Sequence, residues 1–199
     1  SIFSVLSLQW LPGEMTLARI LLGNNLLIVI GVVIGLFHPL KPVADADHRA
    51  ETLLRWTLLI LAIILLLGGA LRVVNLGYSE FQDDEVDIVQ VSLQAIQGDK
   101  SAVLSDVRGP ARTMLAASFF LAADRVGEFD VRWPTALASI VGILAIFCLG
   151  RRLFSPTVGL LAAAIVAVEG ITLGYGRIVQ QESLVNLMAA SAVLCFLLA

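Results

Sequence analysis

Charged residues are scarce in this chain. Only 15% of its 199 residues are Asp, Glu, Lys or Arg, whereas 58% are hydrophobic; soluble domains average about 25% charged residues. The few charges are also absent from long stretches of the sequence. This composition excludes an ordinary soluble domain, gives no reason to expect a nucleic-acid partner, and predicts an integral membrane protein with several spans in a lipid bilayer.

Cysteine is scarce as well. Cys148 and Cys195 lie in apolar stretches, and the sequence contains no CxxC motif and no Cys/His pair. A disulfide framework or a cysteine-based metal site is therefore not predicted, and both thiols are expected to be small buried groups. No signal peptide is evident in the first residues. Because the chain begins without Met and stops inside an apolar run, we expect it to be part of a longer protein.

Long apolar runs predict where the chain crosses the membrane. Roughly 20 apolar residues are needed to span a hydrocarbon core about 30 Å thick. The run from Trp56 to Val74 meets this need most clearly. The predicted spans, including this one, are residues 16–37, 56–74, 133–150, 158–175 and 183–199. Residues 113–123 are too few to span and predict a re-entrant or interfacial helix.

The polar segment 75–112 contains a helical pattern. Apolar residues recur at spacings of three and four, which marks one face of a helix, at Val86, Val89, Leu93 and Ile96. Asp83 or Asp84 is suited to cap this helix and Gly98 to end it. The fold class predicted is all-α: a polytopic transmembrane helical bundle with amphipathic interfacial helices in the first external loop.

Lysine and arginine predict the orientation, because short cytoplasmic loops are enriched in them. The link 41–55 contains three of these residues, and the turn 151–157 contains Arg151 and Arg152. We place both segments in the cytoplasm. Alternation of the spans then puts the acidic loop and the link 177–182 together on the extracytoplasmic side.

Asp83, Asp84 and Glu85 are the first candidate site. At a helix start their ionised forms are favoured, and an ionised carboxylate can accept a proton from an attacking group or bind a divalent cation. The simpler interpretation is that one acid caps the helix while the others are solvated. Both interpretations are about equally supported by these residues alone.

A second candidate site follows the span at 158–175. Tyr175, Arg177 and Glu182 lie between two spans, and the donors of an arginine match phosphate oxygens. The simpler interpretation is an interfacial Arg177 and a Glu182 that caps the next helix. Glu169 lies inside the apolar run, where an acid costs about 2.5–3.5 kcal/mol unless it faces a cavity or a partner. It is therefore either a cavity residue or a hydrogen-bonded structural one.

Several short motifs resemble, in order, the N-terminal part of the GT-C glycosyltransferases. The branch is that of dolichyl-phosphate-mannose–protein mannosyltransferases and bacterial aminoarabinose transferases. The motifs, spread over residues 56–199, are Arg72-Val73-Val74-Asn75-Leu76, Phe81-Gln82-Asp83-Asp84-Glu85, Gly109-Pro110, Val131-Arg132-Trp133-Pro134-Thr135-Ala136-Leu137, Leu149-Gly150-Arg151-Arg152-Leu153-Phe154, Tyr175-Gly176-Arg177-Ile178 and Gln181-Glu182-Ser183-Leu184. Each motif is weak alone, and the prediction depends on their order.

The resemblance implies an inverting transfer of a sugar from a polyprenyl-phosphate donor outside the cytoplasm. It assigns catalytic roles to Asp84 as base, Glu85 and Glu182, and places Arg177 near the lipid phosphate as a substrate-binding residue. Asp83, Glu169 and Tyr175 are further substrate-binding candidates, and Asp83 makes the acidic run longer than the pair usual in the family. No metal ligand is assigned, and a divalent cation near Asp84 is left open. Residue 180, often basic in the family, is Gln180 here.

The resemblance also divides the chain. Residues 1–55 are an extra N-terminal segment with one span and a cytoplasmic link. Residues 56–199 are the GT-C-like module, whose external loop is 76–132. The expected location is the bacterial cytoplasmic membrane. The alternative is a catalytically inactive GT-C-like structural subunit, bound to other membrane subunits in a larger complex. A transporter fragment is disfavoured because no inverted repeat is visible.

Overall fold

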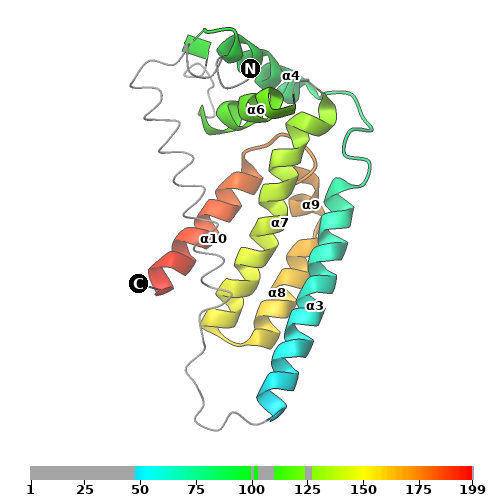
Figure 1. Ribbon diagram of the computed structural model, residues 1–199, viewed down its shortest axis with the longest axis vertical. Helices are drawn as coiled ribbons and strands as arrows, with labels where there is room; N and C mark the ends of the chain where they lie inside the picture. Colours follow the sequence, from blue (N-terminus) through cyan, green and yellow to red (C-terminus); the bar gives the residue numbers. More distant parts are fainter. Residues whose placement is uncertain (1–47, 100, 103–109, 124–126, 199) are drawn as a thin grey trace.

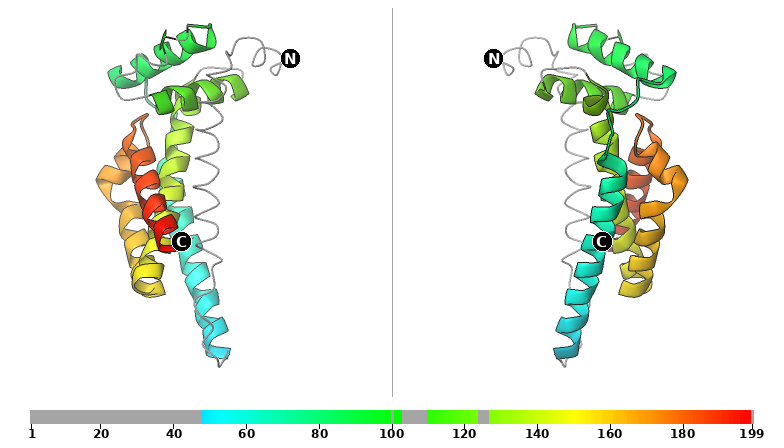
Figure 2. Two further views of the ribbon diagram at one scale, coloured as in Figure 1. Left: turned by 90° about the vertical axis from the view of Figure 1, so that its left-hand side faces the viewer. Right: turned by 90° about the vertical axis from the view of Figure 1, so that its right-hand side faces the viewer.

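The described part of the chain is a bundle of helices capped at one end by two further helices. The computed structural model describes residues 48–99, 101–102, 110–123 and 127–198, and among these it contains no strand. Four helices run along the long axis (Figure 1): α3 (His48–Val73), α7 (Glu128–Leu153), α8 (Pro156–Val168) and α10 (Glu182–Leu198). Two lie across one end (Figure 2): α4 (Asp83–Ile96) and α6 (Pro110–Ala123). The predicted span at 16–37 lies outside the described residues.

The all-α prediction is confirmed. Helices α3 and α7 are each long and apolar enough to cross a membrane, and α8 and α10 are apolar but shorter. In α3 the buried residues are Leu61, Gly68 and Arg72, which lie seven and four positions apart and so share one face. Most other large side chains of α3 are exposed apolar groups, as a helix surrounded by lipid requires.

Helix α7 is the centre of the bundle and contacts α3, α6, α8 and α10. It begins at Glu128, so the helix extends beyond the start predicted for the span 133–150, and Pro134 lies inside the helix. The cause is tertiary: Val131 is only 1% exposed and is packed with Ile88 and Phe120 in the core under α4 and α6. Burial of this turn outweighs its local polarity.

Helices α7 and α8 approach closely at two glycines. A Cβ at Gly159 would lie 2.6 Å from the Phe147 carbonyl oxygen, and one at Gly150 would lie 2.9 Å from Gly159 Cα. Small residues of this kind let two membrane helices pack backbone to backbone.

We expect Gly159→Ala to destabilise the bundle by about 1–3 kcal/mol, because the methyl group would force the two backbones apart. The matched control is Gly142→Ala in α7, where an added Cβ meets nothing within 4 Å. Thermal unfolding in detergent, followed by circular dichroism, compares the two variants. Equal midpoints for both variants would contradict the close packing described here.

The predicted span 158–175 is not a single helix. Helix α8 ends at Val168, and α9 (Gly170–Tyr175) begins after Glu169. The Glu169 carboxylate accepts hydrogen bonds from the backbone N–H groups of Ile171 (2.9 Å) and Thr172 (2.8 Å). It therefore caps α9, because these N–H groups have no partner inside the helix. This is the hydrogen-bonded structural role that the sequence left open.

The amphipathic helix predicted in the first loop is present as α4. Its N-cap is Gln82 rather than Asp83 or Asp84, and the Gln82 N–H donates to Glu85 Oε2 at 3.1 Å. Gly98 follows the helix with φ 98°, a left-handed conformation that favours glycine, so the predicted end is confirmed. Cys148 is buried as expected, whereas Cys195 is exposed, contrary to the prediction.

Candidate active site

The first turn of α4 meets the turn 177–181, which precedes α10, at the end of the bundle. Two contacts join them: Glu85 Oε1 accepts from the Val179 N–H (2.9 Å), and Asp84 Oδ2 accepts from Gln180 Nε2 (3.2 Å). These pairs are more than ninety positions apart in the sequence. The two acidic segments singled out in the sequence thus lie on the same end of the molecule.

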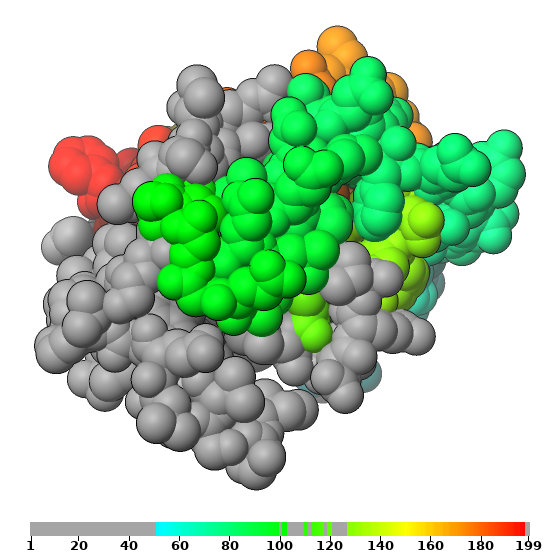
Figure 3. Space-filling view, turned by 90° about the horizontal axis from the view of Figure 1, so that it is seen from above, coloured from blue at the N-terminus to red at the C-terminus, as the bar shows by residue number. Residues whose placement is uncertain are grey.

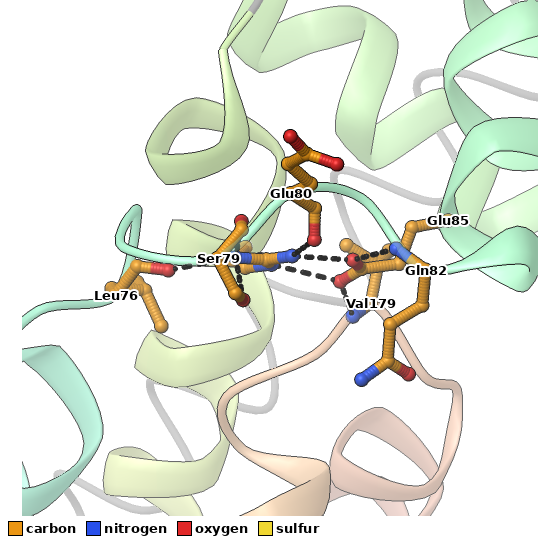
Figure 4. Close-up of polar contacts among 7 residues, drawn as sticks. Leu76, Ser79, Glu80, Gln82, Glu85 and Val179 are labelled. Carbon is orange, nitrogen blue, oxygen red and sulfur yellow. Dashed lines mark hydrogen bonds and ion pairs between the residues drawn. The ribbon is translucent and has the colours of Figure 1, made fainter.

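Arg132, near the start of α7, binds both the Glu85 carboxylate and the loop before α4. Its Nε and Nη2 donate to Glu85 Oε1 (2.9 Å) and Oε2 (2.6 Å), a bidentate ion pair. The other hydrogen bonds of the guanidinium wrap the loop around it (Figure 4), and their acceptors are the Leu76, Ser79 and Glu80 carbonyl oxygens and the Ser79 hydroxyl. The Phe81 ring lies over the same group, with its centroid 5.9 Å from Cζ.

This ion pair is buried. Both Glu85 and Arg132 are 1% exposed, so water does not screen their attraction. Every oxygen of Glu85 has a donor, and Arg132 has partners on three of its nitrogens. The pair and its hydrogen bonds therefore fix α4, α7 and the turn 177–181 relative to one another.

Burial alone raises the pKa of Glu85, because it disfavours the charged form. The hydrogen bonds from Arg132 and from the Gln82 and Val179 N–H groups, with the positive charge of Arg132, outweigh burial and hold the pKa below its usual value.

A lowered folded-state pKa means that Glu85 contributes stability above its unfolded pKa, about 4.3, and loses it as the pH falls through the folded value. We expect the free energy of unfolding of the wild type to decrease below about pH 4. Glu85→Gln should be less stable at pH 7 and show a smaller decrease on acidification. Denaturant titrations in detergent between pH 3 and 7 measure both slopes, and identical slopes would contradict the role of this carboxylate.

Asp84 and Asp83 differ from Glu85 in exposure. Both are exposed at the surface of α4, and Asp84 contacts Gln180. Seen from above, α4 covers much of the described surface at this end of the molecule (Figure 3). Asp84 is thus an exposed acid that contacts the turn 177–181.

The turn 177–181 begins with Arg177 and lies between two other predicted site residues, Tyr175 and Glu182. Half-buried Arg177 donates to the Leu71 carbonyl oxygen through Nη1 and to the Asn75 carbonyl oxygen through Nη2 (3.3 Å), beside the C-terminal end of α3. Such carbonyls are the negative end of a helix. Tyr175 is the last residue of α9 and is 37% exposed. Glu182 begins α10, and its Oε2 is buried with no hydrogen-bond donor among the described residues.

A second buried arginine supports the turn from below. Arg72 is fully buried and its Nε donates to the Ser139 hydroxyl (2.7 Å). The remaining hydrogen bonds go to carbonyl oxygens of Gly68, Ala167 and Val166. A Cβ at Gly176 would lie 2.8 Å from the Ser139 hydroxyl oxygen and 3.3 Å from Arg72 Nε, so glycine at this position lets the chain pack against this hydrogen-bonded pair.

Arg132 is not among the site residues predicted from the sequence. In the sequence it stands only within the motif at residues 131–137, one of those that resemble the family. The signal that could have found it is charge balance: an arginine beside an apolar run needs a buried acid or many carbonyl partners. Which acid pairs with it could not be read from local spacing.

The site offers no metal cluster among the described residues. Within residues 48–99, 101–102, 110–123 and 127–198, no three His, Cys, Asp or Glu side chains are arranged to bind a metal ion. The divalent cation left open near Asp84 therefore has no such group of ligands among the described residues.

The described residues form helices and no strand, and two of these helices are long and apolar enough to cross a membrane, which indicates a helical integral membrane protein. Residues 109–199 match the family model described as dolichyl-phosphate-mannose-protein mannosyltransferase. The predicted resemblance to GT-C glycosyltransferases is thereby confirmed, and the match supports a membrane glycosyltransferase of the GT-C type. The matched residues include Arg132, Arg177 and Glu182, whereas the acids of α4 precede them. No curated protein and no solved structure matches the chain.

Proposed function

We propose that this chain forms part of a glycosyltransferase that moves a sugar from a polyprenyl-phosphate donor to an acceptor on the extracytoplasmic face of a bacterial cytoplasmic membrane. The observation that supports the proposal most is the contact of Asp84 with Gln180, two residues before Glu182. It joins two acidic segments that are far apart in the sequence at one end of an apolar bundle. In a bilayer, a lipid-linked donor would present its phosphate at the end of such a bundle.

In this proposal Asp84 is the general base. The acceptor hydroxyl or amine attacks the anomeric carbon and gives its proton to Asp84. The bond between that carbon and the phosphate oxygen breaks, and the lipid phosphate leaves with the electron pair. Asp83 and Tyr175 are proposed to line the path of the substrate, whereas Glu169 has the structural role of capping α9.

The negative charge that develops on the leaving phosphate needs a cation. Arg177 is the proposed group, since a guanidinium matches phosphate oxygens. Its contacts with the carbonyls of Leu71 and Asn75 fix its direction near the surface. Glu182 is proposed to bind the acceptor, because a buried acceptor atom without a donor is characteristic of functional sites.

Glu85 is proposed to act through its neighbours rather than on the substrate. Both of its carboxylate oxygens accept hydrogen bonds from Arg132, Gln82 and Val179, so protonation of Glu85 by a substrate would break the ion pair. Its role is to hold Asp84 against the turn 177–181.

The inactive structural subunit is the alternative proposal. It predicts that the acids of the two motifs lie apart, whereas Asp84 contacts the turn that precedes Glu182. The contact therefore favours the enzyme.

Reconstitution of the full-length protein in vesicles tests the donor class. We expect transfer of a radiolabelled sugar from a polyprenyl-phosphate donor and none from the corresponding nucleotide sugar. Transfer from the nucleotide sugar alone would contradict the proposal, and absence of transfer from a panel of lipid-linked donors would favour the structural subunit.

A further inference from the structure

The turn 177–181 is fixed on both sides of Gln180. Val179 is 3% exposed, lies in the core with Ile88, and donates its N–H to Glu85 at 2.9 Å. On the other side, α10 begins at Glu182. The backbone around position 180 is therefore positioned by buried contacts, although Gln180 itself is only partly buried.

Asp84 is fixed in the same way. It directly precedes Glu85, whose carboxylate is bound by Arg132. Two consecutive residues of α4 thus contact two consecutive residues of the turn, Glu85 with Val179 and Asp84 with Gln180. This register places the residue 180 side chain on the Asp84 carboxylate whenever the buried pair is formed.

We propose that Gln180 is a positioning residue for Asp84, whose neutral amide orients the carboxylate without adding a positive charge, so that the charge at position 180 sets the pH range in which Asp84 accepts a proton. This inference rests on the proposed function. A glutamine amide carries no net charge and can donate a hydrogen bond to the Asp84 carboxyl group in either of its protonation states. A lysine or arginine would stabilise the ionised form of Asp84 and so weaken the base.

The test follows the Asp84 carboxyl directly. The full-length protein is labelled with ¹³C at the Asp carboxyl carbons in nanodiscs, the Asp84 signal is assigned by its loss in Asp84→Asn, and its chemical shift is titrated. We expect Gln180→Lys to lower the titration midpoint by about half to one unit, less than the 1–3 units typical of close opposite charges because the site is exposed. Gln180→Glu should raise it.

The matched control is Gln97→Lys, which makes the same charge change just after the other end of α4. It lies about 20 Å from Asp84 at 1.5 Å per residue, beyond the screening length of about 8–10 Å at physiological salt. Equal displacement of the Asp84 midpoint by both lysines, or by neither, would overturn the inference.

The two proposals fail separately. If Gln180→Lys moves the Asp84 midpoint while Asp84→Asn retains sugar transfer, the positioning contact stands and Asp84 is not the base. If Asp84→Asn abolishes transfer but substitutions at position 180 leave the Asp84 titration midpoint unchanged, Asp84 remains the proposed base and the role of Gln180 is rejected. The pH profile of transfer should move in parallel with the midpoint, a readout that a purely structural glutamine would leave unchanged.

Discussion

Asp84→Asn in the full-length protein is expected to lower the rate of sugar transfer by about 10²–10⁴-fold, the contribution of a positioned general base. The amide keeps the size of the side chain but cannot accept the acceptor's proton. Because Asp84 is exposed, the exchange should leave folding unchanged. Initial rates in vesicles with a lipid-linked donor measure the effect.

Asp87→Asn is the matched control, and Asp83→Asn tests the proposed substrate-binding acid. Both residues are exposed acids on α4, so each variant makes the same charge change on the same helix. Asp87→Asn should retain transfer, and Asp83→Asn should alter the donor concentration for half-maximal rate more than the rate itself. A rate for Asp84→Asn equal to that of Asp87→Asn would remove Asp84 from the mechanism.

The second large effect concerns Arg132. We expect Arg132→Ala to decrease the free energy of unfolding by about 3–5 kcal/mol, because it leaves the Glu85 carboxylate buried without its counter-ion. The carbonyl oxygens of Leu76, Ser79 and Glu80 also lose their donor. Reversible unfolding in detergent at pH 7 provides the measurement.

Arg152→Ala is the control, since that arginine is exposed at the opposite end of α7 and should change stability by less than about 0.5 kcal/mol. The double variant Glu85→Leu/Arg132→Met should recover part of the loss, because it removes both buried charges together. A loss below about 1 kcal/mol for Arg132→Ala would show that the ion pair does not join these helices.

Much of the fold could be predicted because its signals are local. The uninterrupted apolar run gives α3, and the three- and four-residue spacing gives α4. Gly98 ends α4 because few other residues adopt its backbone angle. The break at Glu169 was missed, since an apolar run does not reveal that one side chain will bind two N–H groups and start a new helix.

The candidate site was only partly predictable. Asp84, Glu182 and Arg177 could be proposed from the sequence because acids and arginines at the ends of apolar runs are conspicuous, and the structure places all three at one end of the bundle. Arg132 was missed because its partner lies 47 positions away, and no spacing rule selects Glu85 over its neighbours. The start of α7 at Glu128 was missed for the same reason, since Val131 is buried by other helices.

The sequence by itself determined that this protein is helical and apolar and that its acids gather at the ends of apolar segments. These properties follow from composition and from periodicity within single helices. Only the tertiary structure decided which acid is buried and which is exposed. Glu85 forms a buried ion pair with Arg132, whereas the exposed Asp84 accepts a hydrogen bond from Gln180. The physical reason is that burial and ion pairing depend on which segments pack together, and that choice is made by contacts between residues far apart in the chain.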